Sequence, residues 1–149
     1  MNSGLVVLAV AVVAALGFGL WRAASDGRFR GTHRVRGLAE PAQQPAPASV
    51  LSDTAYDGRL GERATLLQFS SAFCAPCRAT RRVLDEVATI VPGVVHVEVD
   101  AEHHLDLVRR LGILRTPTTL VLDPEGREVS RASGAPTKQA VIASLGPLA

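Results

Sequence analysis

The first hydrophobic feature of the chain is an unbroken apolar run over residues 5–21, with only uncharged residues before it. About 20 apolar residues cross the hydrocarbon core of a bilayer, so this run predicts a transmembrane helix within residues 1–21. Trp21 followed by Arg22 is typical of the end of a span at the membrane surface. A cleaved signal peptide is the alternative. It is disfavoured because no basic residue precedes the run and no small-residue cleavage motif follows it.

The segment after the span is polar, and its composition changes from arginine-rich to proline-rich. Residues 22–37 hold five arginines against one aspartate, and residues 38–50 contain three prolines and little apolar bulk. This composition predicts a linker over residues 22–48 that is basic and then Pro/Ala-rich. Arginines close to a single span favour the cytoplasmic side, so we expect a single-pass protein with its C-terminal part in the cytoplasm. An extracytoplasmic placement is the alternative.

From residue 49 to residue 149, short apolar runs alternate with segments of helical periodicity. Strands separated by helices predict an α/β domain with parallel pairing, a late antiparallel hairpin at the edge, and helices on both faces of a mixed sheet. Residues 50–63 fit either an extra edge strand or a short helix. In the first helix, Val83, Val87 and Ile90 share one face and are predicted to point inward. The predicted strands are 64–70, 94–99, 118–122 and 127–132, and the predicted helices are 76–90, 102–111 and 136–145.

The positive charge of the chain is concentrated outside this domain. The whole chain has a formal net charge of +2, while residues 49–149 hold 11 basic and 12 acidic side chains. Aromatic residues make up 4% of the chain, and none is interleaved with the arginines as a stacking surface would require. We therefore expect no nucleic-acid partner.

The two cysteines of the chain, Cys74 and Cys77, lie three residues apart at a strand-to-helix junction. The first thiol lies where free backbone N–H groups and the helix dipole favour a thiolate, and the second is close enough to form a disulfide with it. Two structural cysteines or half of a zinc site are the alternatives. A zinc site needs two further ligands, and the adjacent His103 and His104 point in different directions on a helix. We expect neither a metal nor a cofactor.

The domain resembles the thioredoxin family in the order of its elements and in its motifs. The resemblance implies a thioredoxin-like fold and a thiol–disulfide oxidoreductase. It also implies that Pro117 is the family's cis-proline, which faces the disulfide. Thr116 would then offer backbone groups to an extended segment of the substrate. The features that carry the resemblance are Phe-Cys-Ala-Pro-Cys at 73–77, Thr116-Pro117 directly before a strand, Gly126 and Gly134.

The same resemblance assigns roles within the motif itself. Cys74 corresponds to the attacking thiol and Cys77 to the resolving thiol that releases the reduced substrate. Ala75 and Pro76 separate the two cysteines and add no charge. A histidine between the cysteines would stabilise the thiolate and favour an oxidant, so this pair is expected to be reducing.

Four positions depart from the family pattern. Gln68 stands where the family has a buried aspartate that manages the proton of the second thiol, and His96 stands in place of that aspartate's lysine partner. Gln68 does not ionise and is no general base, so resolution is slower or His96 takes part through water. Phe73 and Ser70 replace two usual tryptophans, which changes the surface offered to partners.

The leading hypothesis is a membrane-tethered thiol–disulfide oxidoreductase that reduces protein disulfides through Cys74 and Cys77. Its partners would be disulfide-containing proteins, an upstream reductant that the sequence does not identify, and the membrane through residues 1–21. The alternatives are an outward-facing anchored thioredoxin of the cytochrome-c-maturation type and a non-catalytic binding module, which Gln68 supports. A single span without a small-residue seam favours a monomer.

Overall fold

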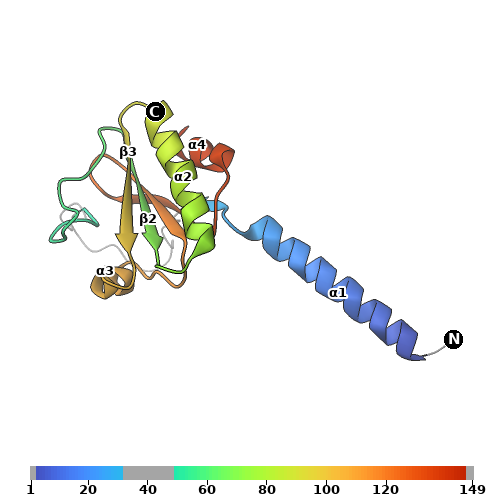
Figure 1. Cartoon of the computed structure of the whole chain (residues 1–149). Coiled ribbons are helices and arrows are strands. Elements are labelled where there is room, and N and C mark those ends of the chain that lie inside the picture. Colours follow the sequence, from blue (N-terminus) through green and yellow to red (C-terminus); the bar gives the residue numbers. More distant parts are fainter. Residues whose placement is uncertain (1–2, 32–48, 147–149) are drawn as a thin grey trace, which may run out of the picture.

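The computed structural model describes residues 3–31 and 49–146 of the chain (Figure 1). The predicted membrane segment forms one helix, α1 (Ser3–Ser25), which projects away from the folded domain. Within it, Ser3–Arg22 is long and apolar enough to cross a membrane, a property that a signal sequence shares. The Pro/Ala-rich part of the predicted linker lies outside the described residues.

The centre of the domain is a mixed β-sheet whose strand order is β1-β5-β4-β2-β3. Strands β2 and β3 are parallel, and the pairs β2–β4, β4–β5 and β1–β5 are antiparallel. Every residue of β2 is buried, because it lies between two strands and beneath elements on both faces. The strands are β1 (Phe29–Gly31), β2 (Ala64–Ser70), β3 (Val94–Asp100), β4 (Thr118–Leu122) and β5 (Glu128–Ser133).

Strand β4 runs opposite to the direction that the alternation of strands and helices predicted. The connecting helix α3 (Leu105–Arg110) has six residues, which is about 9 Å. Strand β3 has seven residues, which is about 23 Å. A helix this short cannot bring the chain back to the end of the sheet at which β2 and β3 begin, as a parallel β4 would require. The chain therefore crosses the end of the sheet and enters β4 in the antiparallel direction, on the other side of β2.

Strand β1 comes from residues that the charge pattern assigned to the linker. It pairs Phe29 with Ala132 and Gly31 with Ser130 along β5. This pairing moves the β4–β5 hairpin, predicted at the edge, into the interior of the sheet. The segment between residues 50 and 63 forms turns and is neither of the two predicted elements. It still contributes Leu51, which is fully buried.

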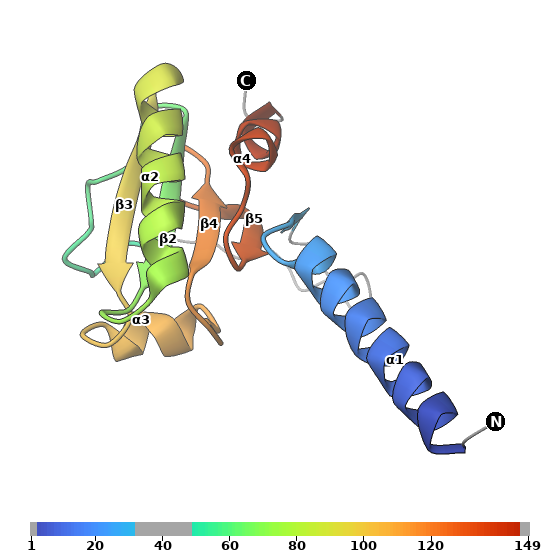
Figure 2. The same ribbon diagram turned by 45° about the vertical axis from the view of Figure 1, so that its right-hand side comes forward.

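Two apolar cores lie on the two faces of the sheet. Helices α2 (Ala75–Ile90) and α4 (Lys138–Leu145) cover one face, and α3 with the turns after residue 49 covers the other (Figures 1 and 2). Of the predicted inward face of α2, Val87 is buried and Val83 packs against the core, but Ile90 is half-exposed. Cys77, Thr80 and Leu84 complete the buried face. The first core includes Ala64, Leu66, Leu84, Val87, Val121, Val141 and Leu145, and the second includes Leu51, Leu67, Phe69, Val97, Val99, Leu107 and Leu120.

Candidate active site

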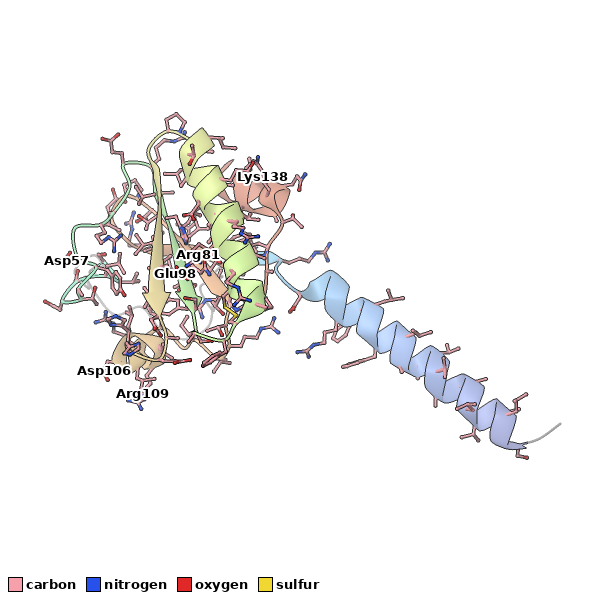
Figure 3. All side chains as sticks on the ribbon, in the orientation of Figure 1. Asp57, Arg81, Glu98, Asp106, Arg109 and Lys138 are labelled. Atoms are coloured by element: carbon pink, nitrogen blue, oxygen red, sulfur yellow. A yellow bond between two sulfur atoms is a disulfide. The ribbon has the colours of Figure 1, made fainter. Side chains whose placement is uncertain are left out.

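The two cysteines form a disulfide across the first turn of α2, with their Cα atoms 5.2 Å apart. Figure 3 shows this bond in yellow at the N-terminal end of the helix. Cys74 is the N-cap residue with extended backbone angles, and its Sγ accepts a hydrogen bond of 3.1 Å from the Cys77 N–H. Such a donor stabilises negative charge on a sulfur at this position. Cys77 is buried, and Cys74 is half-buried.

The residues next to the cysteines are exposed. The Phe73 side chain is 99% exposed, and Ala75 and Pro76 lie on the surface of the first helical turn. Pro76 is tolerated there, because the first turn of a helix has N–H groups without acceptors in any case. An exposed aromatic ring beside a disulfide gives a partner protein an apolar surface to contact.

The Thr116–Pro117 loop is hydrogen-bonded to Ser71 in the segment just before Cys74, although it is about forty residues away in the sequence. The Thr116–Pro117 peptide bond is cis, as the resemblance implied. A hydrogen bond of 3.1 Å joins the Ser71 and Thr116 hydroxyls, and the Pro117 carbonyl accepts a bond of 2.8 Å from the Gly134 N–H. These bonds hold the loop between the start of α2 and the end of β5. Leu114, which belongs to no recognisable sequence motif, is 96% exposed just before this loop.

Gln68 lies beneath the disulfide and is fully buried. Its Nε2 donates a hydrogen bond of 3.0 Å to the Cys77 carbonyl, which ties β2 to the first turn of α2. The Gln68 Oε1 and the hydroxyls of Thr80 and Thr119 are buried without hydrogen-bond partners among the described residues. Thr119 is opposite Gln68 in the β2–β4 register. Neutral polar side chains therefore line the sheet at the position of the family's carboxylate.

His96 does not contact Cys77 or Gln68 through any hydrogen bond in the described part of the chain. Its Nδ1 lies 2.6 Å from Asp85 Oδ1, and its side chain is nearly buried under α2. Asp85 follows Cys77 by eight residues along the helix, which is about 12 Å. In the disulfide form, the geometry thus joins His96 to the middle of α2 and not to the thiol pair.

A polar hollow of about 410 Å³ adjoins the disulfide. Ser70 lines it, at a position where the family pattern has a tryptophan, and the small side chain leaves the space open. Arg81 and Glu98 cross the hollow as an ion pair of 3.2 Å, visible in Figure 3. Arg78 also lines the hollow and has no ion pair among the described residues.

Asp100, at the other side of this hollow, stays ionised over a wide pH range. A hydrogen bond from the His103 side chain lowers the pKa of the Asp100 carboxyl, and a bond from the Glu102 N–H lowers it further. On the same wall, burial raises the pKa of the Tyr56 phenol, which lies 2.9 Å from His104 Nε2. The hollow therefore presents fixed charges of both signs next to Cys74, unlike the apolar surface at Phe73.

The described residues contain no group of three or more His, Cys, Asp or Glu side chains placed to hold a metal ion. The reactive groups of the site are the two sulfur atoms at the start of α2, of which that of Cys77 is buried and that of Cys74 is accessible. A disulfide of this kind defines a thiol–disulfide oxidoreductase.

Comparison with known proteins identifies the family. The family model named Thioredoxin matches residues 47–146. The chain belongs to the thioredoxin family, and its Cys74–Cys77 pair is the redox-active pair of a thioredoxin-type oxidoreductase.

Individual relatives agree with this assignment. A putative thioredoxin H10 from Arabidopsis thaliana is 24% identical over 116 residues, which are 77% of this chain and 72% of that protein. A thioredoxin from Chlamydia trachomatis is 27% identical over 93 residues, covering 62% of this chain and 90% of the relative. Among solved structures, Fasciola hepatica thioredoxin matches with a TM-score of 0.53 and 22% identity, over 60% of this chain and 84% of the other. At this level of identity, the structural match supports the fold and nothing further.

Proposed function

We propose that the protein is a membrane-tethered reductase of protein disulfides, in which Cys74 attacks the substrate and Cys77 releases it. The observation that carries this proposal is the unequal burial of the pair. Cys77 is 2% exposed, whereas Cys74 is half-buried at the helix start. A thiolate must reach a sulfur of the substrate to exchange with it. Cys74 therefore makes the intermolecular contact, and Cys77 acts within the protein.

The exchange moves two electrons from the reduced cysteine pair to the substrate. The Cys74 thiolate attacks one sulfur of the substrate disulfide, and the other substrate sulfur leaves as a thiolate that takes up a proton. Cys77 then loses its proton and attacks Cys74 Sγ, and the bond between Cys74 and the substrate breaks. The second substrate thiol leaves, and the Cys74–Cys77 disulfide remains. An upstream reductant supplies two electrons to restore the pair.

The surrounding residues position this chemistry. Gln68 holds the Cys77 carbonyl at 3.0 Å and so keeps the resolving thiol beneath Cys74. Thr116 presents backbone groups for an extended segment of the substrate, next to Pro117. Phe73 offers an apolar contact outside the disulfide. Ala75 and Pro76 add no charge, which supports a reducing pair.

The tether is the N-terminal helix α1. Its length and apolar composition suit a bilayer span, and Trp21 followed by Arg22 suits the membrane surface. The excess of arginines after the span supports a cytoplasmic domain. Membership of the thioredoxin family speaks against the non-catalytic binding module.

Cysteine variants of the full chain in detergent micelles test the chemistry. With insulin as the substrate and dithiothreitol as the reductant, we expect Cys74→Ser to lower the rate of insulin reduction to that of dithiothreitol alone, because no accessible protein thiol remains. We expect Cys77→Ser to accumulate a mixed disulfide that a non-reducing gel detects. Full activity of Cys74→Ser would refute the proposal.

Protease access to the domain tests its placement. We expect cleavage in inverted membrane vesicles and protection in right-side-out vesicles. The opposite pattern would support the outward-facing alternative of the cytochrome-c-maturation type.

A further inference from the structure

The end of helix α1 is joined to the domain by specific contacts. Asp26 Oδ1 lies 2.5 Å from the Arg115 guanidinium, and the Gly27 N–H donates a bond of 2.9 Å to the Ser133 carbonyl. Gly27 has a positive φ, and a Cβ there would lie 2.2 Å from the Ala135 carbonyl oxygen. The backbone after the helix thus lies directly on the loop after β5, and the helix end has a defined place beside the domain (Figure 2).

A hollow of about 360 Å³ lies at this junction and is rich in arginine. The cationic side chains come from three parts of the chain: the helix end and the segment after it, the loop before β4, and strand β5. Asp26 is the one acidic side chain that lines it, so the lining carries three excess positive charges. The residues that line it are Trp21, Arg22, Asp26, Arg28, Arg115, Arg131 and Ser133.

The four arginines of the hollow differ in their partners. Arg115 pairs with Asp26, and Arg131 pairs with Glu128, whose hydrogen bonds raise the pKa of the Arg131 guanidinium. Arg22 and Arg28 have no ion pair within residues 3–31 and 49–146. Two arginines are therefore ordered by acidic partners, and two remain available for an anion.

The position of the hollow indicates the source of that anion. Trp21, the only tryptophan of the chain, lines it at the end of the apolar helix, where a tethered protein meets the headgroup layer. Guanidinium groups bind phosphate oxygens in bidentate geometry, and basic pockets beside membrane helices bind anionic headgroups. We propose that this hollow binds the phosphate of an anionic phospholipid headgroup in the leaflet next to the domain. The inference depends on the proposed tethering by α1.

A headgroup bound in this hollow would set the orientation of the catalytic domain relative to the membrane. Arg115 lines the hollow and directly precedes the Thr116–Pro117 loop of the active site. A headgroup held by these arginines fixes the domain against the membrane surface. The disulfide is then presented to substrates that lie close to the membrane.

The single tryptophan makes the proposal measurable. The full chain is placed in detergent micelles with brominated phosphatidylglycerol or brominated phosphatidylcholine, and quenching of Trp21 fluorescence gives the relative binding constant of the two lipids. We expect phosphatidylglycerol to bind several-fold more tightly. In the double variant Arg22→Gln/Arg28→Gln, we expect this preference to be lost, because the two arginines without acidic partners no longer attract the anionic headgroup.

The matched control is Arg82→Gln/Arg109→Gln, which removes two exposed arginines outside the hollow and should leave the preference unchanged. Equal binding of the two lipids by the wild-type chain, or an equal loss in the control, would overturn the proposal. Displacement of phosphatidylglycerol by millimolar inorganic phosphate would assign the hollow to a free phosphate ion instead.

Flotation with vesicles after an alkaline wash tests the tether separately. A chain that floats with phosphatidylcholine vesicles but shows no lipid preference retains the tether and lacks the headgroup site. A chain that does not float contradicts both the tether and the inference that depends on it.

Discussion

At the scale of single residues, the site differs from the family pattern because a neutral amide, Gln68, lies beneath the disulfide where the family has a carboxylate. Gln68 replaces a carboxylate by an amide, and its Nε2 is engaged with the Cys77 carbonyl. An amide neither accepts nor releases the proton of the resolving thiol at ordinary pH. We therefore propose that Gln68 acts by positioning Cys77 and that the proton of Cys77 leaves by another route.

Replacing the amide by a carboxyl tests this interpretation. In Gln68→Asp, burial is expected to raise the carboxyl pKa above its unfolded value. The part of the stability loss that comes from ionisation is then absent at low pH and grows as the pH rises, to about 1–3 kcal/mol at pH 8. Above that pKa, the carboxylate accepts the Cys77 proton, so resolution of the mixed disulfide is expected to accelerate.

Urea unfolding at pH 5 and pH 8, with stopped-flow resolution kinetics, measures both effects. Gln68→Asn is the control, because it shortens the side chain without adding an ionisable group. Faster resolution in Gln68→Asn would contradict a role for the new charge.

Arg78 is the second residue whose role is testable in isolation. It follows Cys74 by one helical turn and lines the same polar hollow. In Arg78→Glu, a negative charge replaces a positive one near the attacking sulfur, which disfavours the thiolate. We expect several-fold slower alkylation of the reduced protein by iodoacetamide at pH 7. The control Arg82→Glu reverses a charge outside the hollow and should react as the wild type does; equal slowing in both variants would indicate a general charge effect.

At the scale of elements, the sheet is completed by a strand from the membrane-proximal segment. Strand β1 covers the edge of β5, and an edge strand otherwise leaves backbone groups free to pair with another chain. The strand is only three residues long. Its position therefore depends on the close backbone approach at Gly27, where there is no room for a side chain.

The variant Gly27→Ala tests that approach. Its Cβ would clash with the Ala135 carbonyl, and its backbone would be strained by the positive φ. We expect a loss of about 2–3 kcal/mol in the free energy of unfolding and faster hydrogen exchange along β5. Gly58→Ala is a matched control, because Gly58 has a similar φ with nothing within 4 Å of the added Cβ. It should lose about 1 kcal/mol from strain alone. Equal losses in both variants would refute the contact.

At the scale of the whole molecule, a thioredoxin-family domain follows an apolar helix whose end contacts the domain beside its active-site loop. The arginines after the helix favour the cytoplasmic side, and the uncharged residues between the cysteines favour a reducing pair. These two expectations support each other, because a low reduction potential, in the range of thioredoxins, suits a reductant on the cytoplasmic side.

The reduction potential of the full chain connects the two expectations. We expect about −250 mV or lower for the Cys74–Cys77 pair, within the range of thioredoxins. Equilibration with glutathione and dithiothreitol buffers, followed by thiol alkylation, gives the value. A potential tens of millivolts above the glutathione pool would indicate an oxidant or isomerase and would contradict the cytoplasmic placement.

The sequence alone determined the features that depend on neighbouring residues. Strand β2 and helix α2 lie within one residue of the predicted bounds, because apolar periodicity and turn residues act locally. The Cys74–Cys77 pair and the Thr116–Pro117 dipeptide were sufficient to predict the family and the chemistry, since each is a short contiguous motif.

The tertiary structure decided the features that depend on contacts between distant residues. The direction of β4 follows from the short crossing at α3, and the pairing of β1 with β5 joins segments about one hundred residues apart. The partner of Gln68, the pairing of His96 with Asp85, and the arginine-lined hollow likewise exist only after folding. Periodicity reports which face of an element is buried, but it does not report which other element buries it. That choice is made by packing and by backbone hydrogen bonds across the whole domain.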